Sequence, residues 1–125
     1  MDLNSIFNPK SIAVIGASKD TTKIGHVIFR NLVEGNFNGN IYGVNPNAYE
    51  IIGQPIYPSL KDILGPIDLA VIAVPAPLVK QVMQQCVEKK VKGVIVISSG
   101  FSEVGNITEE QEIAQIAKDA DIAMI

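Results

Sequence analysis

The sequence predicts an α/β fold in which a doubly wound parallel sheet is covered by helices on both faces. Short runs of β-branched and apolar residues alternate along the chain with segments whose apolar residues recur at helical spacing. The predicted strands are apolar almost throughout, which is typical of parallel strands covered on both faces. The first strand also ends at a glycine directly before a helix, and Rossmann-like folds use this arrangement to hold a phosphate group.

Length, composition and charge bound the possible functions. The 125 residues, 47% of them hydrophobic and 18% charged, suffice for one core, so we expect a single domain over 1–125. A net charge of −3 with scattered basic residues argues against a nucleic-acid partner. No apolar run is long enough to span a membrane and the N-terminus does not resemble a signal peptide, so we expect a cytoplasmic protein. The single cysteine, Cys86, excludes an internal disulfide and a multi-cysteine metal site.

The order of elements follows from the hydrophobic pattern. Strands are expected at 11–15, 41–44, 68–74 and 93–97, with a fifth at 122–125. A helix starting at 108 is expected to be the third of the chain. The apolar faces of the first two helices carry Ile24, Val27, Ile28, Leu32 and Val33 in one and Leu78, Val79, Val82, Met83, Cys86 and Val87 in the other. Because the sequence stops inside the fifth strand, we interpret it as the N-terminal part of a longer chain.

The loop after the first strand has the residues of a phosphate site. Gly16 permits a tight turn, Ser18 offers a hydroxyl group, and Lys23 can pair with a phosphate. Gly25 lets a ligand approach the start of the following helix closely. A glycine-rich connection without a ligand is the alternative, since a single glycine motif is a weak signal.

The loop after the second strand argues against a dehydrogenase. An NAD-binding domain usually has an acidic residue here, which accepts hydrogen bonds from the ribose hydroxyls. This chain has Asn45, Pro46 and Asn47 instead. An amide can still bond to a ribose or an adenine, but it lacks the negative charge that favours the diol. The alternative for these residues is a plain turn.

Two further loops follow the third and fourth strands. Pro75 and Pro77 fix the backbone directly before a helix, and such a rigid wall suits a flat ring or a pantetheine arm. A simple strand-to-helix junction is the alternative. The loop at 98–105 presents hydroxyl groups, a glycine, an aromatic ring and Glu103, and a polar surface loop is the alternative there.

Taken together, these loops carry a family resemblance. The successive segments SIFNPKSIAVIGAS, KIG, YGVNPN, PSLKDI, DLAVIAVPAPL and KGVIVISSGFSEVG resemble the N-terminal CoA-binding domain of ADP-forming (NDP-forming) acyl-CoA synthetases. Acetate–CoA ligase, with its α subunit, is the best-known member, and the α subunit of succinyl-CoA synthetase is a more distant relative. The resemblance covers essentially the whole chain, and VPAPL and SSGFSEVG are its most specific motifs.

The resemblance implies a coenzyme A site. It implies that the first loop holds the CoA phosphates, the second contacts the adenosine end, the third lines the nucleotide and pantetheine, and the fourth supplies a hydroxyl-glycine turn. The residues at these positions are Gly16, Ala17, Ser18, Lys23, Ile24 and Gly25; Asn45, Pro46 and Asn47; Val74, Pro75, Ala76 and Pro77; and Ser98, Ser99 and Gly100. Relatives often carry a lysine in the second loop, where this chain has Asn47 and Ala48, so we expect either a weaker affinity for CoA or a charge supplied by Lys23.

The resemblance also implies a reaction that this piece cannot perform alone. The family converts acyl-CoA, ADP and phosphate into acid, ATP and CoA through a phosphorylated histidine of the next domain. ATP or ADP and Mg²⁺ bind elsewhere, in other synthetase domains or in an ATP-grasp β subunit. We expect no catalytic residue and no metal site here. His26, at a helix start, is assigned no catalytic role.

Three functions therefore stand side by side. In the first hypothesis, the chain is the CoA-binding domain of such a synthetase, which is a ligase, and this domain is inactive alone. Alternatively, it is a non-catalytic CoA-binding or regulatory module, either stand-alone or fused to a protein acetyltransferase. An NAD(P)-dependent oxidoreductase domain is the third hypothesis, which the missing acidic residue disfavours.

Overall fold

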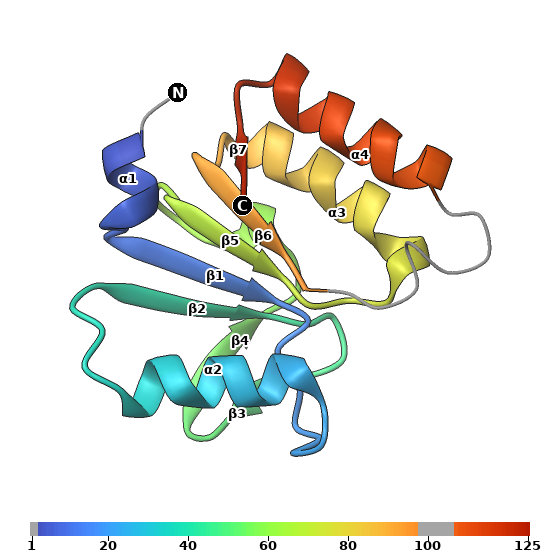
Figure 1. The fold of residues 1–125 in the computed structure, drawn as a ribbon. Helices are drawn as coiled ribbons and strands as arrows, with labels where there is room; N and C mark the ends of the chain where they lie inside the picture. The colour runs from blue at the N-terminus through green and yellow to red at the C-terminus, as the bar shows by residue number, and fades with distance from the viewer. Residues whose placement is uncertain (1–2, 98–106) are drawn as a thin grey trace.

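A computed structural model describes residues 3–97 and 107–125, which form a mostly parallel sheet with helices on both faces (Figure 1). The seven strands of this sheet lie in the order β3-β4-β2-β1-β5-β6-β7. The elements are α1 (Leu3–Phe7), β1 (Ser11–Ile15), α2 (Ile24–Glu34), β2 (Asn40–Val44), β3 (Glu50–Ile51), β4 (Gln54–Tyr57), the 3₁₀ turn η1 (Leu60–Asp62), β5 (Leu69–Ile72), α3 (Ala76–Lys89), β6 (Gly93–Val96), α4 (Ile107–Asp119) and β7 (Ala123–Met124). The predicted α/β class with a doubly wound sheet is confirmed.

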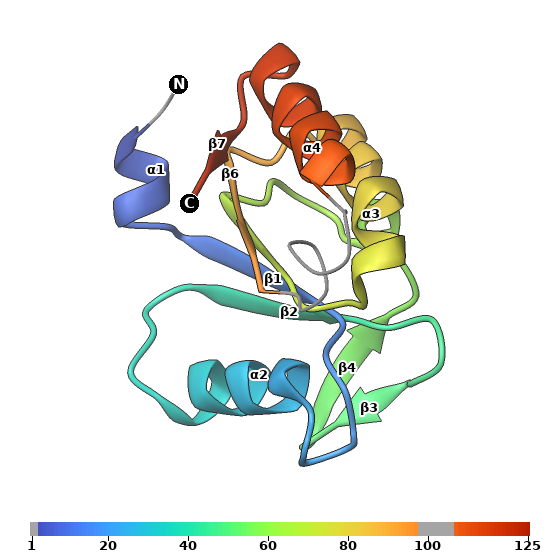
Figure 2. The same ribbon diagram turned by 45° about the vertical axis from the view of Figure 1, so that its right-hand side comes forward.

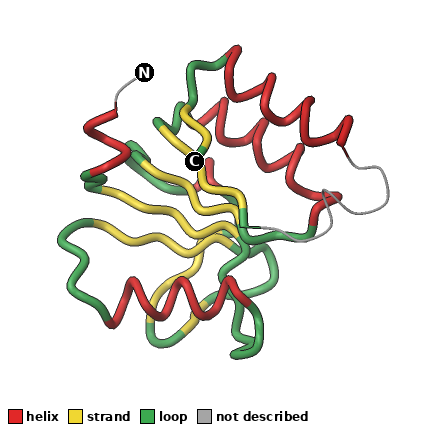
Figure 3. The backbone as a smooth tube through the Cα atoms, viewed as in Figure 1, coloured by secondary structure: helices red, strands yellow, loops and turns green. Residues whose placement is uncertain are grey.

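The winding of the sheet reverses beside β1. This strand pairs in parallel with β2 on one side and with β5 on the other. The chain first winds outward from β1 to β2 and β4, then returns to β5 and winds the other way through β6 to β7. In open sheets of this kind, ligands bind at the carboxyl ends of the strands, next to the reversal. The loops that follow β1, β2 and β5 gather at this edge (Figure 3).

Different helices cover the two faces. Helix α2 packs against β1 and β2, whereas α3 lies on the opposite face against β5, with α4 beside it (Figures 1 and 2). Residues of β1 alternate between the two cores, as the two-residue period of a strand requires. Val14 packs in the cluster of Phe29, and Ala13 and Ile15 pack in the cluster of Val79. Both faces of the central strands are therefore buried, which explains their apolar sequences.

The first turns of α2 and α3 differ from the predicted apolar faces. Ile24 and Leu78 were expected to pack inward, but their side chains are 49% and 48% exposed. The core anchor of α2 is instead Phe29, which is 1% exposed. Both helices begin at the carboxyl edge of the sheet, so side chains of their first turns line a pocket there and do not pack on the strands.

Several short elements were not predicted. They comprise α1 and the segment from β3 to η1, where strands of two to four residues are too short for a recognisable period. The hairpin between β3 and β4 turns at Ile52 and Gly53, both with positive φ. The predicted strand at 68–74 is shorter, Leu69–Ile72, and the helix predicted from 108 begins at Ile107. The fifth predicted strand is present as Ala123–Met124.

Candidate functional site

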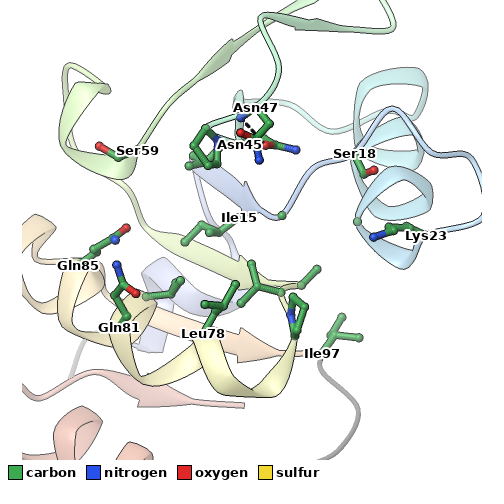
Figure 4. Close-up of a pocket in the computed structure, with 18 of the residues that line it drawn as sticks. Ile15, Ser18, Lys23, Asn45, Asn47, Ser59, Leu78, Gln81, Gln85 and Ile97 are labelled. Atoms are coloured by element: carbon green, nitrogen blue, oxygen red, sulfur yellow. Dashed lines mark hydrogen bonds between the residues drawn. The ribbon is translucent and has the colours of Figure 1, made fainter.

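A pocket of about 1000 Å³ lies at the carboxyl edge of the sheet (Figure 4). Its volume is at the upper end of the range of roughly 300–1,000 Å³ found for small-molecule sites. Five parallel strands contribute residues at or just after their ends. These residues are Ile15 and Gly16 after β1, Val44 to Asn47 after β2, Pro58 and Ser59 after β4, Ala73 to Leu78 after β5, and Ile97 after β6.

Two glycines allow the turn after β1 to pack tightly. Gly16 has φ +98°, and a Cβ atom there would lie 2.3 Å from the carbonyl oxygen of Ala73. A Cβ atom at Gly25 would lie 1.9 Å from the carbonyl oxygen of Gly16. Both distances are far shorter than van der Waals contact, so the turn, the start of α2 and the end of β5 can meet only if both residues are glycine.

The N-terminus of α2 presents free donors to the pocket. Its N-cap residue, Lys23, makes no side-chain capping bond. The N–H groups of Ile24 and Gly25 have no acceptor within the described parts of the chain, and all three residues line the pocket. Unpaired N–H groups at a helix start, together with the helix dipole and a lysine, form a site suited to an anion such as a phosphate.

Hydrogen bonds hold the loop before α2 in shape. The Asp20 N–H donates to Ser18 Oγ over 3.0 Å, and Asp20 Oδ1 accepts from the N–H and the hydroxyl of Thr22 over 3.0 and 2.6 Å. The bonds from Thr22 lower the pKa of the Asp20 carboxyl group below its usual value. The Lys23 N–H donates to the Asp20 carbonyl oxygen. The loop therefore has a defined geometry in the free protein.

Asn45 links the first two loops. Its Nδ2 donates to the carbonyl oxygen of Ala17 over 2.8 Å, and its Oδ1 accepts from the Asn47 N–H over 2.8 Å. An amide is the side chain of this size that can both donate and accept here. An aspartate would place a carboxylate against the Ala17 carbonyl oxygen with no proton to donate. The structure thus gives a physical reason for the absence of the acidic residue typical of NAD sites.

The pocket is apolar along one side and rich in amides at one end. Its apolar wall comprises Val74, Pro75, Pro77, Leu78 and Ile97. In the view of Figure 4, Gln81, Gln85 and Ser59 lie at the end away from Ser18 and Lys23. A ligand that spans the pocket would therefore contact an anion site at one end and neutral hydrogen-bonding groups at the other.

The sequence analysis missed this amide end. Gln81 and Gln85 are four residues apart on α3, and Leu78 precedes Gln81 by one helical turn. Helical spacing puts Gln81 and Gln85 on the same face of the helix as Leu78, next to the Pro75–Pro77 turn. The sequence could therefore have predicted that they line the pocket. Ser59 was less accessible, although its capping pair with Asp62 is visible in the sequence and is present in the structure.

The structure places most of the predicted site residues together. The following residues line the one pocket: Gly16, Ser18, Lys23, Ile24, Gly25, Asn45, Pro46, Asn47, Val74, Pro75, Ala76 and Pro77. Ala17 does not line it: the side chain is fully buried against the cluster of Phe29, and the carbonyl oxygen is bound by Asn45. Ser98, Ser99 and Gly100 lie outside the described residues.

Neither Cys86 nor His26 lies among the residues that line the pocket. Cys86 is fully buried, and burial raises the pKa of its thiol group to about 12, so it stays protonated. His26 is 5% exposed, and its Nδ1 lies 2.8 Å from the carbonyl oxygen of Ser18. In the described parts of the chain, no three His, Cys, Asp or Glu side chains are arranged to hold a metal ion. No helix there is long and apolar enough to cross a membrane.

Fold and pocket together define a class. The sheet is doubly wound, and an uncapped helix N-terminus with glycines and a lysine lies next to the point where its winding reverses. This combination is typical of domains that bind a phosphate-bearing nucleotide cofactor. The particular family follows from comparison with known proteins. A family model described as CoA binding domain matches residues 10–125, and the chain belongs to this family.

Relatives of the chain are much longer enzymes. It is 49% identical to acetate–CoA ligase (ADP-forming) II of Archaeoglobus fulgidus, covering 94% of this chain and 18% of that protein. It is 48% identical to acetate–CoA ligase (ADP-forming) of Methanocaldococcus jannaschii, covering 99% of this chain and 17% of that protein. The chain thus spans about a fifth of the length of these relatives.

A solved structure has the same fold. It is a dinucleotide forming acetyl-coenzyme A synthetase 1 of Ca. Korarchaeum cryptofilum, in complex with phosphate and ADP. The two share 44% sequence identity with a TM-score of 0.93, over 99% of this chain and 27% of the synthetase. The predicted family resemblance is confirmed.

Proposed function

We propose that this chain is the CoA-binding domain of an ADP-forming acyl-CoA synthetase. The observation that carries the proposal is the uncapped start of α2, where Gly16, Lys23 and Gly25 meet at one end of a large pocket. This arrangement suits the diphosphate of CoA, because N–H donors, the helix dipole and a lysine all favour an anion. The ligase relatives support the same function.

The rest of the pocket suits the two parts of CoA that the diphosphate joins. We assign the adenosine end to the part of the pocket lined by Asn45 and Asn47 and, further from Lys23, by Gln81 and Gln85. The pantetheine arm then runs along the wall formed by Val74 to Pro77 and past Ile97. Ser98, Ser99 and Gly100 remain part of the proposed site. In this assignment Ala17 contributes through its backbone.

The complete reaction needs parts beyond this domain. We propose that the whole enzyme converts acyl-CoA, ADP and phosphate reversibly into acid, ATP and CoA. The phosphorylated histidine and the site for ATP, ADP and Mg²⁺ would lie on other synthetase domains or on an ATP-grasp subunit. This chain would be the N-terminal domain of such a cytoplasmic enzyme and inactive by itself. Its role is to hold CoA so that the thiol is presented to those domains.

Calorimetric titration with CoA, dephospho-CoA and NAD tests the binding role. We expect saturable binding of CoA and no binding of NAD. Weaker binding of dephospho-CoA would show that the 3′-phosphate is recognised as well. Binding of NAD without CoA, or no binding of any of the three, would contradict the proposal.

A pair of lysine variants tests the position of the diphosphate. Lys23→Gln removes the charge at the pocket, whereas Lys92→Gln removes one directly before β6, at the opposite end of the strands. Loss of a charged contact should weaken CoA binding about tenfold or more in Lys23→Gln. It should also reduce the salt dependence of the dissociation constant. Lys92→Gln should bind as the wild type does, and equal effects of the two variants would refute the assignment.

A further inference from the structure

His26 forms a hydrogen bond to the loop between β1 and α2 but does not line the pocket. It lies in the first turn of α2, is 5% exposed, and does not line the pocket. Its Nδ1 is 2.8 Å from the carbonyl oxygen of Ser18, eight residues earlier. A carbonyl oxygen can only accept, so Nδ1 carries the proton and donates it to this oxygen. The hydrogen bond therefore specifies the Nδ1-protonated tautomer in the neutral ring.

A second side chain holds the neighbouring peptide group. Asn45 Nδ2 donates to the carbonyl oxygen of Ala17 over 2.8 Å, so two successive carbonyl groups of the loop are bound by side chains from different elements. In a planar trans peptide, the N–H group points away from the carbonyl group that precedes it. The bonds to Ala17 and Ser18 thus fix the directions of the N–H groups of Ser18 and Lys19. Neither N–H has an acceptor in the part of the chain that the structure describes.

We propose that His26 is a positioning residue of the anion site: it holds the peptide group that follows Ser18, and so keeps Ser18, which lines the pocket, in the conformation that presents its N–H group to a phosphate before the ligand arrives. The inference rests on the proposed CoA-binding function, and it adds a residue that does not touch the ligand. Preorganised donors bind more tightly because ligand binding does not have to order the loop. His26 is buried and its Nδ1 is bonded to the loop, so it can hold the loop without itself contacting the phosphate.

Three variants separate positioning from simple packing. His26→Leu keeps an apolar side chain of similar bulk but has no donor. His26→Asn keeps an N–H donor close to the position of Nδ1, and is the conservative rescue. Val33→Ala, near the other end of α2, removes half-buried packing without touching the loop, and serves as the matched control for lost stability.

The readouts are the dissociation constants for CoA and for inorganic pyrophosphate, with thermal melting as the check on folding. We expect His26→Leu to bind both ligands about tenfold less tightly and His26→Asn to recover most of that loss of affinity. Val33→Ala should bind both ligands as the wild type does. In ¹H–¹⁵N spectra, pyrophosphate should shift the amide signal of Ser18 in the wild type and in His26→Asn, and much less in His26→Leu.

The outcomes distinguish this inference from the proposed function. If the wild type binds CoA and a folded His26→Leu binds it equally well, the inference is overturned while the function stands. Equal weakening in Val33→Ala, or no recovery in a folded His26→Asn, would likewise overturn it. A long-range ¹H–¹⁵N spectrum that shows the proton on Nε2 would remove its geometric basis. A wild type that binds neither CoA nor pyrophosphate would instead contradict the proposed function.

Discussion

Gly25 packs against the backbone of Gly16 so closely that a methyl group at position 25 would lie 1.9 Å from the Gly16 carbonyl oxygen. This contact sets the start of α2 directly beside the end of β1. The free N–H groups of the helix therefore reach the pocket. The same contact that positions the helix thus also creates the anion site.

Gly25→Ala should disrupt both stability and binding. Relief of the clash requires α2 or the turn to move, so we expect the free energy of unfolding to fall by about 3 kcal/mol and CoA binding to be lost. Urea unfolding and calorimetry measure the two effects. Gly53→Ala is the control: its φ is +78° but nothing lies within 4 Å of the added methyl group, so only about 1 kcal/mol of backbone strain is expected. A Gly25→Ala variant as stable as Gly53→Ala would contradict the clash.

Asn45→Asp should weaken CoA binding without creating an NAD site. The carboxylate would still accept from the Asn47 N–H, but it could not donate to the Ala17 carbonyl oxygen. Repulsion between two acceptors should open the loop and weaken CoA binding more than tenfold. Titration of the variant with CoA and with NAD checks both statements. A gain of NAD binding would show that the side chain at this position alone separates the two cofactor classes.

Replacing both glutamines that line the pocket should selectively weaken binding of the adenosine part of CoA. The amides of Gln81 and Gln85 line the pocket and have no side-chain partner among the described residues. The double variant Gln81→Ala, Gln85→Ala should bind CoA several-fold less tightly but pantetheine unchanged, because hydrogen bonds lost to a bound ligand cost about 1 kcal/mol each. Gln84→Ala is the matched control, since Gln84 lies on the same helix but outside the pocket lining. Equal loss for CoA and pantetheine would reverse the assigned orientation of CoA.

Burial of Cys86 should make stability fall at alkaline pH. Its thiol pKa is raised from 9.0 to about 12 by desolvation, so the folded state favours the protonated form. This contribution is fully present below pH 9 and is lost as pH rises from 9 toward 12, because the unfolded chain then ionises first. Between pH 8 and pH 10 the wild type should lose about 1.4 kcal/mol more unfolding free energy than Cys86→Ala, as measured by urea titration. Equal losses would show that the thiol is accessible to solvent.

Prediction from sequence succeeded for long or repetitive features. The β-branched runs of β1, β2, β5 and β6 and the helical spacing in α3 are signals that a window of residues carries by itself. Twelve of the predicted site residues line one pocket, since residues that follow parallel strands must meet at one edge of the sheet. The loop at 98–100 stays a prediction.

The remaining features depended on contacts between distant segments. Phe29 was not expected to anchor α2, because its burial depends on how the helix is rotated over Val14. The strands β3 and β4 have a few residues each and are defined by their pairing with each other and with β2. Ala17 lies in the middle of the predicted loop, yet its side chain is turned into the core.

By itself, the sequence determined the α/β class, the order of the main elements and the identity of three loops that line the pocket, those after β1, β2 and β5. These properties follow from hydrophobic periods and from glycine and proline positions, which act over a few neighbouring residues. Tertiary structure alone decided which groups face the pocket. Gln85 of α3 and Ser59, which precedes η1, both line the pocket, and Asn45 and His26 bind adjacent carbonyl groups of the loop after β1. Such pairings depend on the direction in which each element packs, and this direction is set by the whole core.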